Sequence, residues 1–362
     1  MTTPHALPML HDSWYAVAWS HEIKRAPLAR TILGRELLFR RSPTGQLHVT
    51  TNVCPHRQAR LSAGKQLADG RIQCPYHAWE FDLDGRCVNV PTLPEDARVP
   101  PQACLTSYPA VEEQSLVWVW MGRPGGESTH PVPGFDYDSL GAQVRHQRLP
   151  STRWQANYID LIENALDPSH IQTVHPNTLG PNWAATVGNV SIEAFENGRG
   201  FTAVSGEPLR AVADRNLVDF RKLLRLPVVK TAHYRFDFGG VTQVRYEYAD
   251  GCSDMAYAAI TPSDEQHTWV FFGILRSHMR NFIGDALQQT AMFFLQREDL
   301  AAIANLSQER PADLRRRVSV GSDRMGNLYL KQLIRLLEAE GRGPDAAGRR
   351  PSLPVLDEDA AQ

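Results

Sequence analysis

Two short segments in the first third of the chain each combine a cysteine with a histidine. The first contains Cys54 and His56, and the second contains Cys74 and His77, with seventeen residues between the two segments. Two thiolates and two imidazoles can bind tetrahedral Zn²⁺, or a [2Fe–2S] cluster in which the histidines hold one iron and the cysteines the other. Zinc fingers usually keep like ligands together, whereas both segments here run from cysteine to histidine. This order favours an iron–sulfur cluster over zinc.

The surroundings of these segments suit such a cluster. A proline follows each cysteine and stiffens the loop, and Trp79 and Phe81 can shield a cluster from water. Histidines in place of two anionic thiolates reduce the negative charge on the cluster and raise its reduction potential. A centre of this kind can pass single electrons to a metal that binds oxygen.

A second group of metal-binding side chains lies near the middle of the chain, where polar residues recur every three or four positions. We expect one helix that brings Asn164, Asp167 and His170 to the same face. His175 lies five residues past His170, which is out of line for a regular helix. Because the residue before a proline is disfavoured in the helical region, Pro176 should end the helix and let His175 turn back toward the same point.

Two imidazoles need a carboxylate to complete the facial triad that binds non-haem Fe(II) and leaves positions open for O₂ and substrate. Asp299 is the candidate, because it interrupts the apolar stripe of a helix predicted over 285–306. A buried carboxylate needs a counter-charge, so the alternative is a structural salt bridge to Arg297 or another cation. Glu298 should point about 100° away and face solvent.

The cysteine and histidine segments resemble the Rieske domain of ring-hydroxylating and demethylating oxygenases, whose pattern is C-x-H and, after a spacer, C-x-x-H. The resemblance continues past the second histidine, with Ala78 where the family usually has glycine. The segment from Asn164 to His175 and the late pair Glu298 and Asp299 resemble the vanillate O-demethylase and dicamba monooxygenase branch of this family. Together these motifs span most of the chain.

The resemblance implies a role for each of these side chains. The ligands of the [2Fe–2S] cluster would be Cys54, His56, Cys74 and His77. The ligands of a mononuclear Fe(II) would be His170, His175 and Asp299. Two further residues would serve catalysis: Asn164 near the iron, and Asp167 as a bridge. Asp167 would accept hydrogen bonds from His170 and, across a subunit interface, from His77, which couples the two centres.

In related enzymes this bridge joins the subunits of a head-to-tail trimer, because the two metal centres within one chain are too far apart for rapid electron transfer. The resemblance therefore implies a homotrimer. It also implies a ferredoxin, or a flavin and iron–sulfur reductase, that passes on electrons from NAD(P)H. Neither a nucleic acid nor a membrane is expected as a partner.

The function predicted on these grounds is that of the terminal oxygenase in a multicomponent Rieske system, acting on an aromatic or related small substrate. The compact length and the motifs resemble monooxygenases that hydroxylate a methyl group, with oxidative O- or N-demethylation as the result. Dioxygenation of an aromatic ring or a diaryl ether is the alternative reaction. An iron–sulfur electron-transfer protein and a zinc-stabilised binding protein are non-catalytic alternatives, but a ferredoxin needs only the first third of this chain.

Length and composition fit a globular enzyme of two domains. The chain has 362 residues, of which 42% are hydrophobic and 22% charged, with a formal net charge of -2. These values are typical of globular enzymes and give no sign of a nucleic-acid partner. The chain shows neither a signal-peptide pattern nor an apolar run long enough to span a bilayer, so a cytoplasmic location is expected.

Short strands separated by turns are predicted in the first third of the chain, which indicates an all-β domain. The expected strands are 14–19, 31–40, 46–53 and 115–120. The Ser-Pro-Thr-Gly sequence at 42–45 supplies a hairpin turn. We place the Rieske domain at 1–125 and a Pro/Gly-rich linker at 126–150.

The remainder mixes long helices with aromatic-rich strands, so the fold class predicted for the whole chain is α+β. The expected helices and strands are 285–306 and 323–340, and 233–238, 242–248 and 268–275. The resemblance implies a helix-grip type catalytic domain over 151–342, with a curved antiparallel sheet and helices. The segment 343–362 carries too little apolar surface to pack, so we expect a flexible tail.

The walls of a substrate pocket should come from the chain between His175 and Asp299. The aromatic candidates are Trp183, Phe220, Tyr234, Phe236, Tyr246, Tyr257 and Phe272. Side chains of these types more often belong to a plain core than to a substrate contact.

Overall fold

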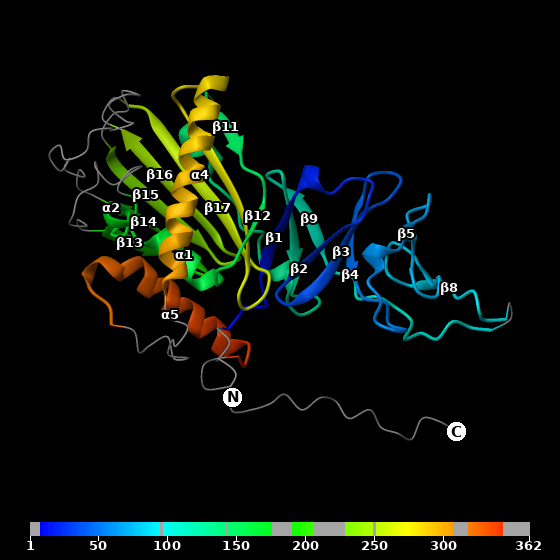
Figure 1. The fold of residues 1–362 in the computed structure, drawn as a ribbon. Coiled ribbons are helices and arrows are strands. Elements are labelled where there is room, and N and C mark those ends of the chain that lie inside the picture. Colours follow the sequence, from blue (N-terminus) through cyan, green and yellow to red (C-terminus); the bar gives the residue numbers. More distant parts are fainter. Residues whose placement is uncertain are drawn as a thin grey trace.

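The described strands form three small antiparallel sheets within residues 14–120, called here the N-terminal half, and one large sheet within residues 145–276, in what is called here the C-terminal half (Figure 1). The computed structural model describes residues 8–94, 97–141, 143–175, 190–205, 229–248, 251–306 and 318–342. No helix in these ranges combines the length and the apolar character needed to cross a membrane.

The small sheets account for the first third of the chain. One consists of β1 (Trp14–Trp19), β10 (Leu116–Trp120) and β9 (Ala110–Glu113), in that order. A second consists of β2 (Leu28–Ile32), β3 (Arg35–Arg41) and β4 (Leu47–Thr51). The third consists of β5 (Lys65–Gln66), β6 (Ile72–Gln73), β7 (Glu80–Phe81) and β8 (Cys87–Asn89). Every residue of β1 and β10 is buried, which explains their continuous apolar sequences.

One predicted strand in this half proves to be two. The chain turns at Leu33 and Gly34, whose φ angles are 49° and 75°, and Ile32 pairs with Arg35 across the turn. Two consecutive residues with positive φ are typical of a two-residue hairpin. Leucine rarely adopts this conformation, so the turn was missed and 31–40 was wrongly predicted as a single strand. The turn predicted at 42–45 is present between β3 and β4.

The large sheet is antiparallel throughout and has the order β11-β18-β17-β16-β15-β14-β13, with β12 also paired to β18. Its strands are β11 (Arg145–Arg148), β12 (Thr152–Trp154), β13 (Val190–Ala194), β14 (Gly200–Ser205), β15 (Val229–Asp237), β16 (Val241–Tyr248), β17 (Ser253–Pro262) and β18 (Thr268–Arg276). The α+β class is therefore confirmed. β11 lies in the range expected to be a linker, 126–150, and its pairing with β18 places these residues in the large sheet instead.

The described α-helices all belong to the C-terminal half. They are α1 (Tyr158–Leu166), α2 (Ile171–Val174), α4 (Phe282–Ala304) and α5 (Arg324–Ala339). Short 3-10 helices are found at η1 (Ser20–Glu22), η2 (Leu61–Ala63), η3 (Gly126–Thr129), η4 (Tyr137–Leu140) and η7 (Gly321–Asp323). Side chains of Asn157 and Asn281 cap the N-termini of α1 and α4 by accepting backbone N–H groups at 2.9 Å. α4 runs across the large sheet, and α5 lies beside α1 at one end of it (Figure 1).

The large sheet is packed on both faces. On β17, Ala258 and Ile260 face one core together with residues of α1 and α5. Their neighbours Tyr257 and Ala259 face a second core, which contains Trp19 and other aromatic residues of β1 and β10. Because successive side chains of β17 point to opposite faces of the sheet, this strand packs against the helices on one side and the small sheets on the other.

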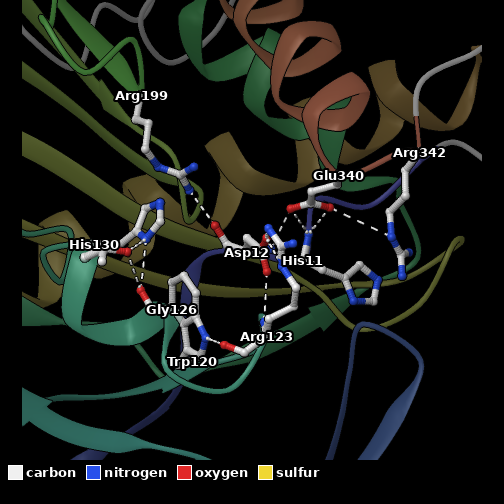
Figure 2. Close-up of polar contacts among 10 residues, drawn as sticks. His11, Asp12, Trp120, Arg123, Gly126, His130, Arg199, Glu340 and Arg342 are labelled. Atoms are coloured by element: carbon white, nitrogen blue, oxygen red, sulfur yellow. Dashed lines mark hydrogen bonds and ion pairs between the residues drawn. The ribbon is translucent and has the colours of Figure 1, made fainter.

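Polar contacts at the two ends of the described chain link the halves once more (Figure 2). The carboxylate of Glu340, just past α5, accepts the backbone N–H groups of His11 and Asp12, at 3.0 and 2.6 Å. The Asp12 carboxylate accepts three hydrogen bonds from Arg123, between 2.9 and 3.1 Å, and the backbone oxygen of Asp12 accepts one from Arg199 at 2.8 Å. The segment that leads into β1 is thus held by both halves.

Candidate metal centres and cavity

Three side chains from two distant segments of the chain converge in the C-terminal half. One ligand atom from each of His170, His175 and Asp299 lies within 4.8 Å of the others. The Oδ1 atom of Asp299 is 3.2 Å from Nε2 of His175 and 3.6 Å from Nε2 of His170. His175 and Asp299 are buried and His170 is half-buried. Two imidazoles and one carboxylate are the donor set that suits ferrous iron with open coordination positions.

The backbone that carries the histidines differs from the predicted single helix. α1 ends at Leu166, Asp167 has an extended conformation (φ −98°, ψ 106°), and His170 is the N-cap residue of the short α2. Asp167 precedes Pro168, and a proline disfavours the helical region for the residue before it. The prediction that Asp167 and His170 share a helix face was therefore wrong. The same rule applied to His175 is confirmed, because α2 ends there with ψ 50°.

Asp299 and His175 each have a further polar neighbour. Asn164 on α1 donates from Nδ2 to Oδ1 of Asp299 at 2.9 Å. The Nδ1 atom of His175 is 2.9 Å from Oε2 of Glu298. We expected Glu298 to face solvent, and this expectation was wrong: the residue before Asp299 reaches the opposite nitrogen of the same imidazole. The alternative salt bridge from Asp299 to Arg297 is absent from the ion pairs of the described residues, and Arg297 lies over the ring of Phe293.

The two imidazoles differ in their electrostatic surroundings. Burial lowers the pKa of His170, and the opposing carboxylates of Asp299 and Asp167 do not fully offset it. Burial also acts to lower the pKa of His175, but its hydrogen bonds and charge interactions with Asp299 and Glu298 outweigh burial and raise it. A metal ligand must be unprotonated at the binding nitrogen, and the Nδ1 contact to Glu298 favours the tautomer that leaves Nε2 of His175 free.

Asp167 contacts His170 mainly through its backbone. Its carbonyl oxygen is 2.5 Å from Nδ1 of His170, whereas its carboxylate Oδ2 is 3.8 Å away. The other carboxylate oxygen accepts the backbone N–H and the hydroxyl of Ser169, at 2.7 and 2.5 Å. The Asp167 side chain is 33% exposed, so it can still contact a second molecule.

The two cysteine and histidine loops of the N-terminal half are built alike. In each loop the cysteine N–H donates to the carbonyl five residues on, and the cysteine carbonyl accepts the N–H four residues on. The residues at this fourth position, Gln58 and Ala78, have φ angles of 58° and 55°. Glycine adopts a positive φ without steric cost, which explains its usual presence in the family where this chain has Ala78.

The four candidate ligands of these loops are grouped by type. Cys54 and Cys74 are buried in one apolar core, and burial, with a smaller contribution from Cys74, raises the pKa of the Cys54 thiol to about 11. The rings of His56 and His77 lie 4.5 Å apart at the exposed end, and Trp79 stacks on His56 at 4.6 Å. Two thiols on one side and two imidazoles on the other fit a cluster with different ligands on each iron.

A single tetrahedral ion would instead need all four side chains to point to one position. Among the described residues, only His170, His175 and Asp299 bring three such ligand atoms within 4.8 Å of one another. The arrangement of the cysteines and histidines therefore fits two irons better than one zinc.

A cavity of about 220 Å³ adjoins the group of His170, His175 and Asp299. One wall is the face of the large sheet formed by alternate residues of β16, β17 and β18. The opposite wall comes from α1 and from α4, whose lining residues are Gln288, Met292, Leu295, Gln296 and Asp299. These residues recur at helical spacing on a single face of α4. The candidate metal ligands thus open onto a mainly apolar space.

Several predicted aromatic residues border this cavity. Tyr234, Tyr246 and Phe272 line it. Tyr257 also borders it, but its ring packs with two aromatic residues on the other face of the sheet. Phe236 lies in the core and not in the lining. The remaining candidates, Trp183 and Phe220, fall outside the described residues. The lining glutamines of α4 were not predicted, although their spacing from Asp299 is a helical signal.

Two family models match the chain and divide it as the two sites do. The model of the Rieske [2Fe-2S] domain matches residues 13–109, which include both cysteine and histidine loops. The model of the vanillate O-demethylase oxygenase C-terminal domain matches residues 154–339, which include the three converging ligands.

Sequence relatives include oxygenase components of two systems. The chain is 39% identical over 172 residues to the oxygenase component of chloroacetanilide N-alkylformylase from Rhizorhabdus wittichii, which covers 47% of this chain and 48% of the relative. It is 35% identical over 175 residues to the oxygenase component of dicamba O-demethylase from Stenotrophomonas maltophilia, with coverage of 47% and 48%. The chain therefore spans about half the length of these curated relatives.

The fold has solved counterparts. A structure of NdmA from Pseudomonas putida CBB5 with caffeine superposes with a TM-score of 0.75 at 24% identity, and it covers 92% of this chain and 93% of that chain. Both halves of the molecule and their arrangement are therefore shared with that structure.

Proposed function

The chain belongs to the family of Rieske oxygenases with a vanillate O-demethylase type of C-terminal domain, and from this premise we propose that it is the terminal oxygenase of a multicomponent system. Members of this family are oxygenases, and the two domains imply a [2Fe–2S] cluster and a mononuclear iron. The proposed reaction is the hydroxylation of a methyl group on a small aromatic or related substrate, which results in oxidative O- or N-demethylation.

The observation that supports this proposal most is that His170, His175 and Asp299 meet on the wall of a cavity. We assign the mononuclear iron to these three side chains. Iron bound by them supplies open coordination positions for O₂ beside the substrate. The chain itself orients the ligands: Glu298 holds the proton on Nδ1 of His175, and Asn164 fixes Oδ1 of Asp299. The apolar wall excludes water from the substrate.

We assign the [2Fe–2S] cluster to the two cysteine and histidine loops, Cys54 with His56 and Cys74 with His77. The half-exposed imidazole end is the side from which an electron can leave the cluster. The proposed acceptor is Asp167 in a second copy of the chain, within a homotrimer. Its partly exposed carboxylate can accept the N–H of His77, while its backbone carbonyl stays in contact with His170.

We further propose a separate electron donor, oxidative demethylation as the reaction, and a cytoplasmic location. Relatives are named as oxygenase components, which favours a separate reductase or ferredoxin that delivers electrons from NAD(P)H. Their names, an N-alkylformylase and an O-demethylase, favour removal of an alkyl group over dioxygenation of a ring or diaryl ether. The second ligand set and its cavity argue against a pure electron-transfer protein.

Metal analysis of the purified chain tests the assignment of both centres. We expect about three irons and two acid-labile sulfides per chain, and a His170→Ala variant that loses one iron but keeps the absorption spectrum of the cluster. Colourless protein with zinc in place of iron and sulfide would disprove the proposal. With the loaded enzyme, incorporation of one ¹⁸O atom from ¹⁸O₂ into the organic products supports hydroxylation, and incorporation of two supports dioxygenation.

A further inference from the structure

The cavity contains hydrogen-bonding side chains that have no partner in the part of the chain that the structure describes. These are Tyr234 on β15, Thr242 on β16, and Gln288 and Gln296 on α4. Tyr234 and Thr242 are each only 4% exposed, whereas Gln288 and Gln296 are half-buried. Polar groups inside proteins are nearly always hydrogen-bonded to protein or to water, so the unpaired groups around this cavity offer hydrogen bonds to a bound molecule that displaces water.

The unpaired groups lie on opposite walls. Tyr234 is paired with Val244 in the register of β15 and β16, so Thr242 is its diagonal neighbour on the same face, at about 7–8 Å. Gln296 faces them from α4, one helical turn before Asp299. A molecule between these walls can be bound from the sheet and from the helix at the same time.

The carboxylates of Asp254 and Asp167 in the lining already have polar neighbours, although Oδ1 of Asp254 forms no hydrogen bond. The carboxylate of Asp254 accepts the hydroxyl of Tyr248 at 2.9 Å and lies 3.1 Å from Nδ1 of His278. Asp167 is bound by Ser169. Arginine and lysine are absent from the described residues of the lining. A carboxylate or sulfonate would therefore lose its hydration without gaining a counter-charge from these residues.

Size limits the substrate to about one ring. A cavity of about 150 Å³ holds benzene, so the 220 Å³ here admits a ring with a few further atoms. Gln296 lies three residues before Asp299, about 4.5 Å along the axis of α4, and its side chain leans toward the helix N-terminus, away from the metal ligands. Gln288 is eleven residues from Asp299, about 16 Å, which is beyond a single ring. Gln296 is the carboxamide at the right distance from an alkyl group placed near Asp299.

We propose that the cavity binds an uncharged aromatic carboxamide and that Gln296 is the residue that selects it. A glutamine side chain offers one acceptor and one N–H₂ donor, which match the N–H and C=O of an amide. Gln296 binds this group and thereby directs an alkyl substituent at the far side of the ring to the metal ligands. The inference specifies the substrate class of the proposed oxygenase and so rests on that function.

Equilibrium binding without turnover tests the inference. Calorimetric titrations of the purified holoenzyme, carried out without oxygen, compare 4-methoxybenzamide with 4-methoxybenzoate and 4-methoxytoluene, which have nearly the same shape. We expect the amide to bind most tightly. Gln296→Leu should weaken amide binding about tenfold, the scale of one or two lost hydrogen bonds, and change binding of 4-methoxytoluene less than twofold. Gln289→Leu, on the exposed face of the same helix, is the matched control.

A variant that binds one probe more tightly distinguishes a specific effect at position 296 from loss of binding through misfolding. Gln296→Glu keeps the shape of the side chain but adds a negative charge, so it should bind the cation 4-methoxybenzylamine more tightly than the unchanged protein does. Tightest binding of the benzoate, an equal loss for all probes in Gln296→Leu, or no gain in Gln296→Glu would overturn the inference. Iron and sulfide analysis of the same samples separates these results from a failure of the proposed function.

Discussion

The Nδ1 atom of His175 lies 2.9 Å from Oε2 of Glu298, while Nε2 of the same ring lies 3.2 Å from Oδ1 of Asp299. Consecutive residues of α4 thus reach both nitrogens of one imidazole. This is possible because His175 directly follows α2, which contacts α4. The candidate ligand Asp299 and Glu298, which orients the ligand His175, are therefore positioned by the same turn of α4.

Glu298→Gln should weaken the mononuclear metal site without affecting the cluster. The amide of glutamine is a weaker acceptor for the Nδ1 proton of His175, and loss of such an orienting carboxylate typically costs 10–100-fold in metal affinity. Iron retained after dialysis against a graded series of chelator concentrations measures the loss. Glu265→Gln, on the exposed turn between β17 and β18, is the control. Iron retention equal to that of the unchanged protein would show that Glu298 does not support the site.

Ala78→Gly should stabilise the second cysteine and histidine loop. A residue other than glycine at φ 55° destabilises the fold by about 1–2 kcal/mol. Replacement by glycine removes this strain, but part of the gain is offset because glycine gives the unfolded chain more conformational freedom. A net gain of about 1 kcal/mol corresponds to a shift of about 2–4 °C in the temperature at which the cluster absorbance is lost.

The neighbouring loop supplies the control for this substitution. Ala59 has no positive φ, so Ala59→Gly should lower the same transition temperature, because glycine only adds freedom to the unfolded chain there. If both substitutions lower it, the backbone at position 78 is not strained.

The sequence reveals the candidate ligands because their chemistry depends on residue type and short spacing. The alternating loops are local, and Pro176 fixes the backbone at His175 by a steric rule that involves neighbours only. The same rule applied to Pro168 indicates the break between α1 and α2, whereas the polar spacing favours a continuous helix.

Other features could not be predicted from local patterns. The role of Glu298 depends on where His175 lies in space, which spacing along α4 does not contain. β17 was missed because Ala256, Ala258 and Ala259 are not typical strand residues, and it is a strand because β16 and β18 pair with it on both sides. The small side chain of Ala258 in turn leaves room for the cavity.

The pH dependence of stability should contain a contribution from His146 on β11. Burial, with a smaller contribution from Arg148, lowers the pKa of His146 to about 4, and its ring is hydrogen-bonded to Tyr257. In the folded protein the His146 ring therefore stays unprotonated at a pH where the same ring in the unfolded chain, with a pKa of about 6.5, binds a proton. Stability should be lost as the pH falls from about 6.5 toward 4.

The loss between pH 7 and pH 5 is about 2 kcal/mol for a fully shielded histidine, and about 1 kcal/mol once solvent screening is allowed for. Urea unfolding at both pH values measures it. Between pH 7 and pH 5 the free energy of unfolding of His146→Gln should fall by about 1 kcal/mol less than that of the unchanged protein, whatever its absolute stability. The control His21→Gln, at an exposed position, should lose as much as the unchanged protein. Equal losses in all three proteins would exclude His146 as a source.

Asp167→Asn should keep both metal centres and slow electron transfer between them at least tenfold. The amide oxygen of asparagine can still accept the hydrogen bonds of Ser169, so the local backbone is retained, but the negative charge proposed to face His77 of another subunit is lost. The rate at which the reduced cluster is oxidised in a single turnover measures the effect, with Asp69→Asn on the surface of the N-terminal half as the control. An unchanged rate with full iron content would exclude Asp167 from the electron path.

The first described residues of the chain pack against residues that are synthesised much later. Leu10 packs in the core of the large sheet, the backbone oxygen of Pro8 accepts the hydroxyl of Tyr158, and His11 is held by Glu340. During synthesis at about 5–20 residues per second, Glu340 emerges roughly 10–40 seconds after residue 125. During this interval the N-terminal half lacks the contacts that bury Leu10. A fragment that ends near residue 125 never acquires these contacts.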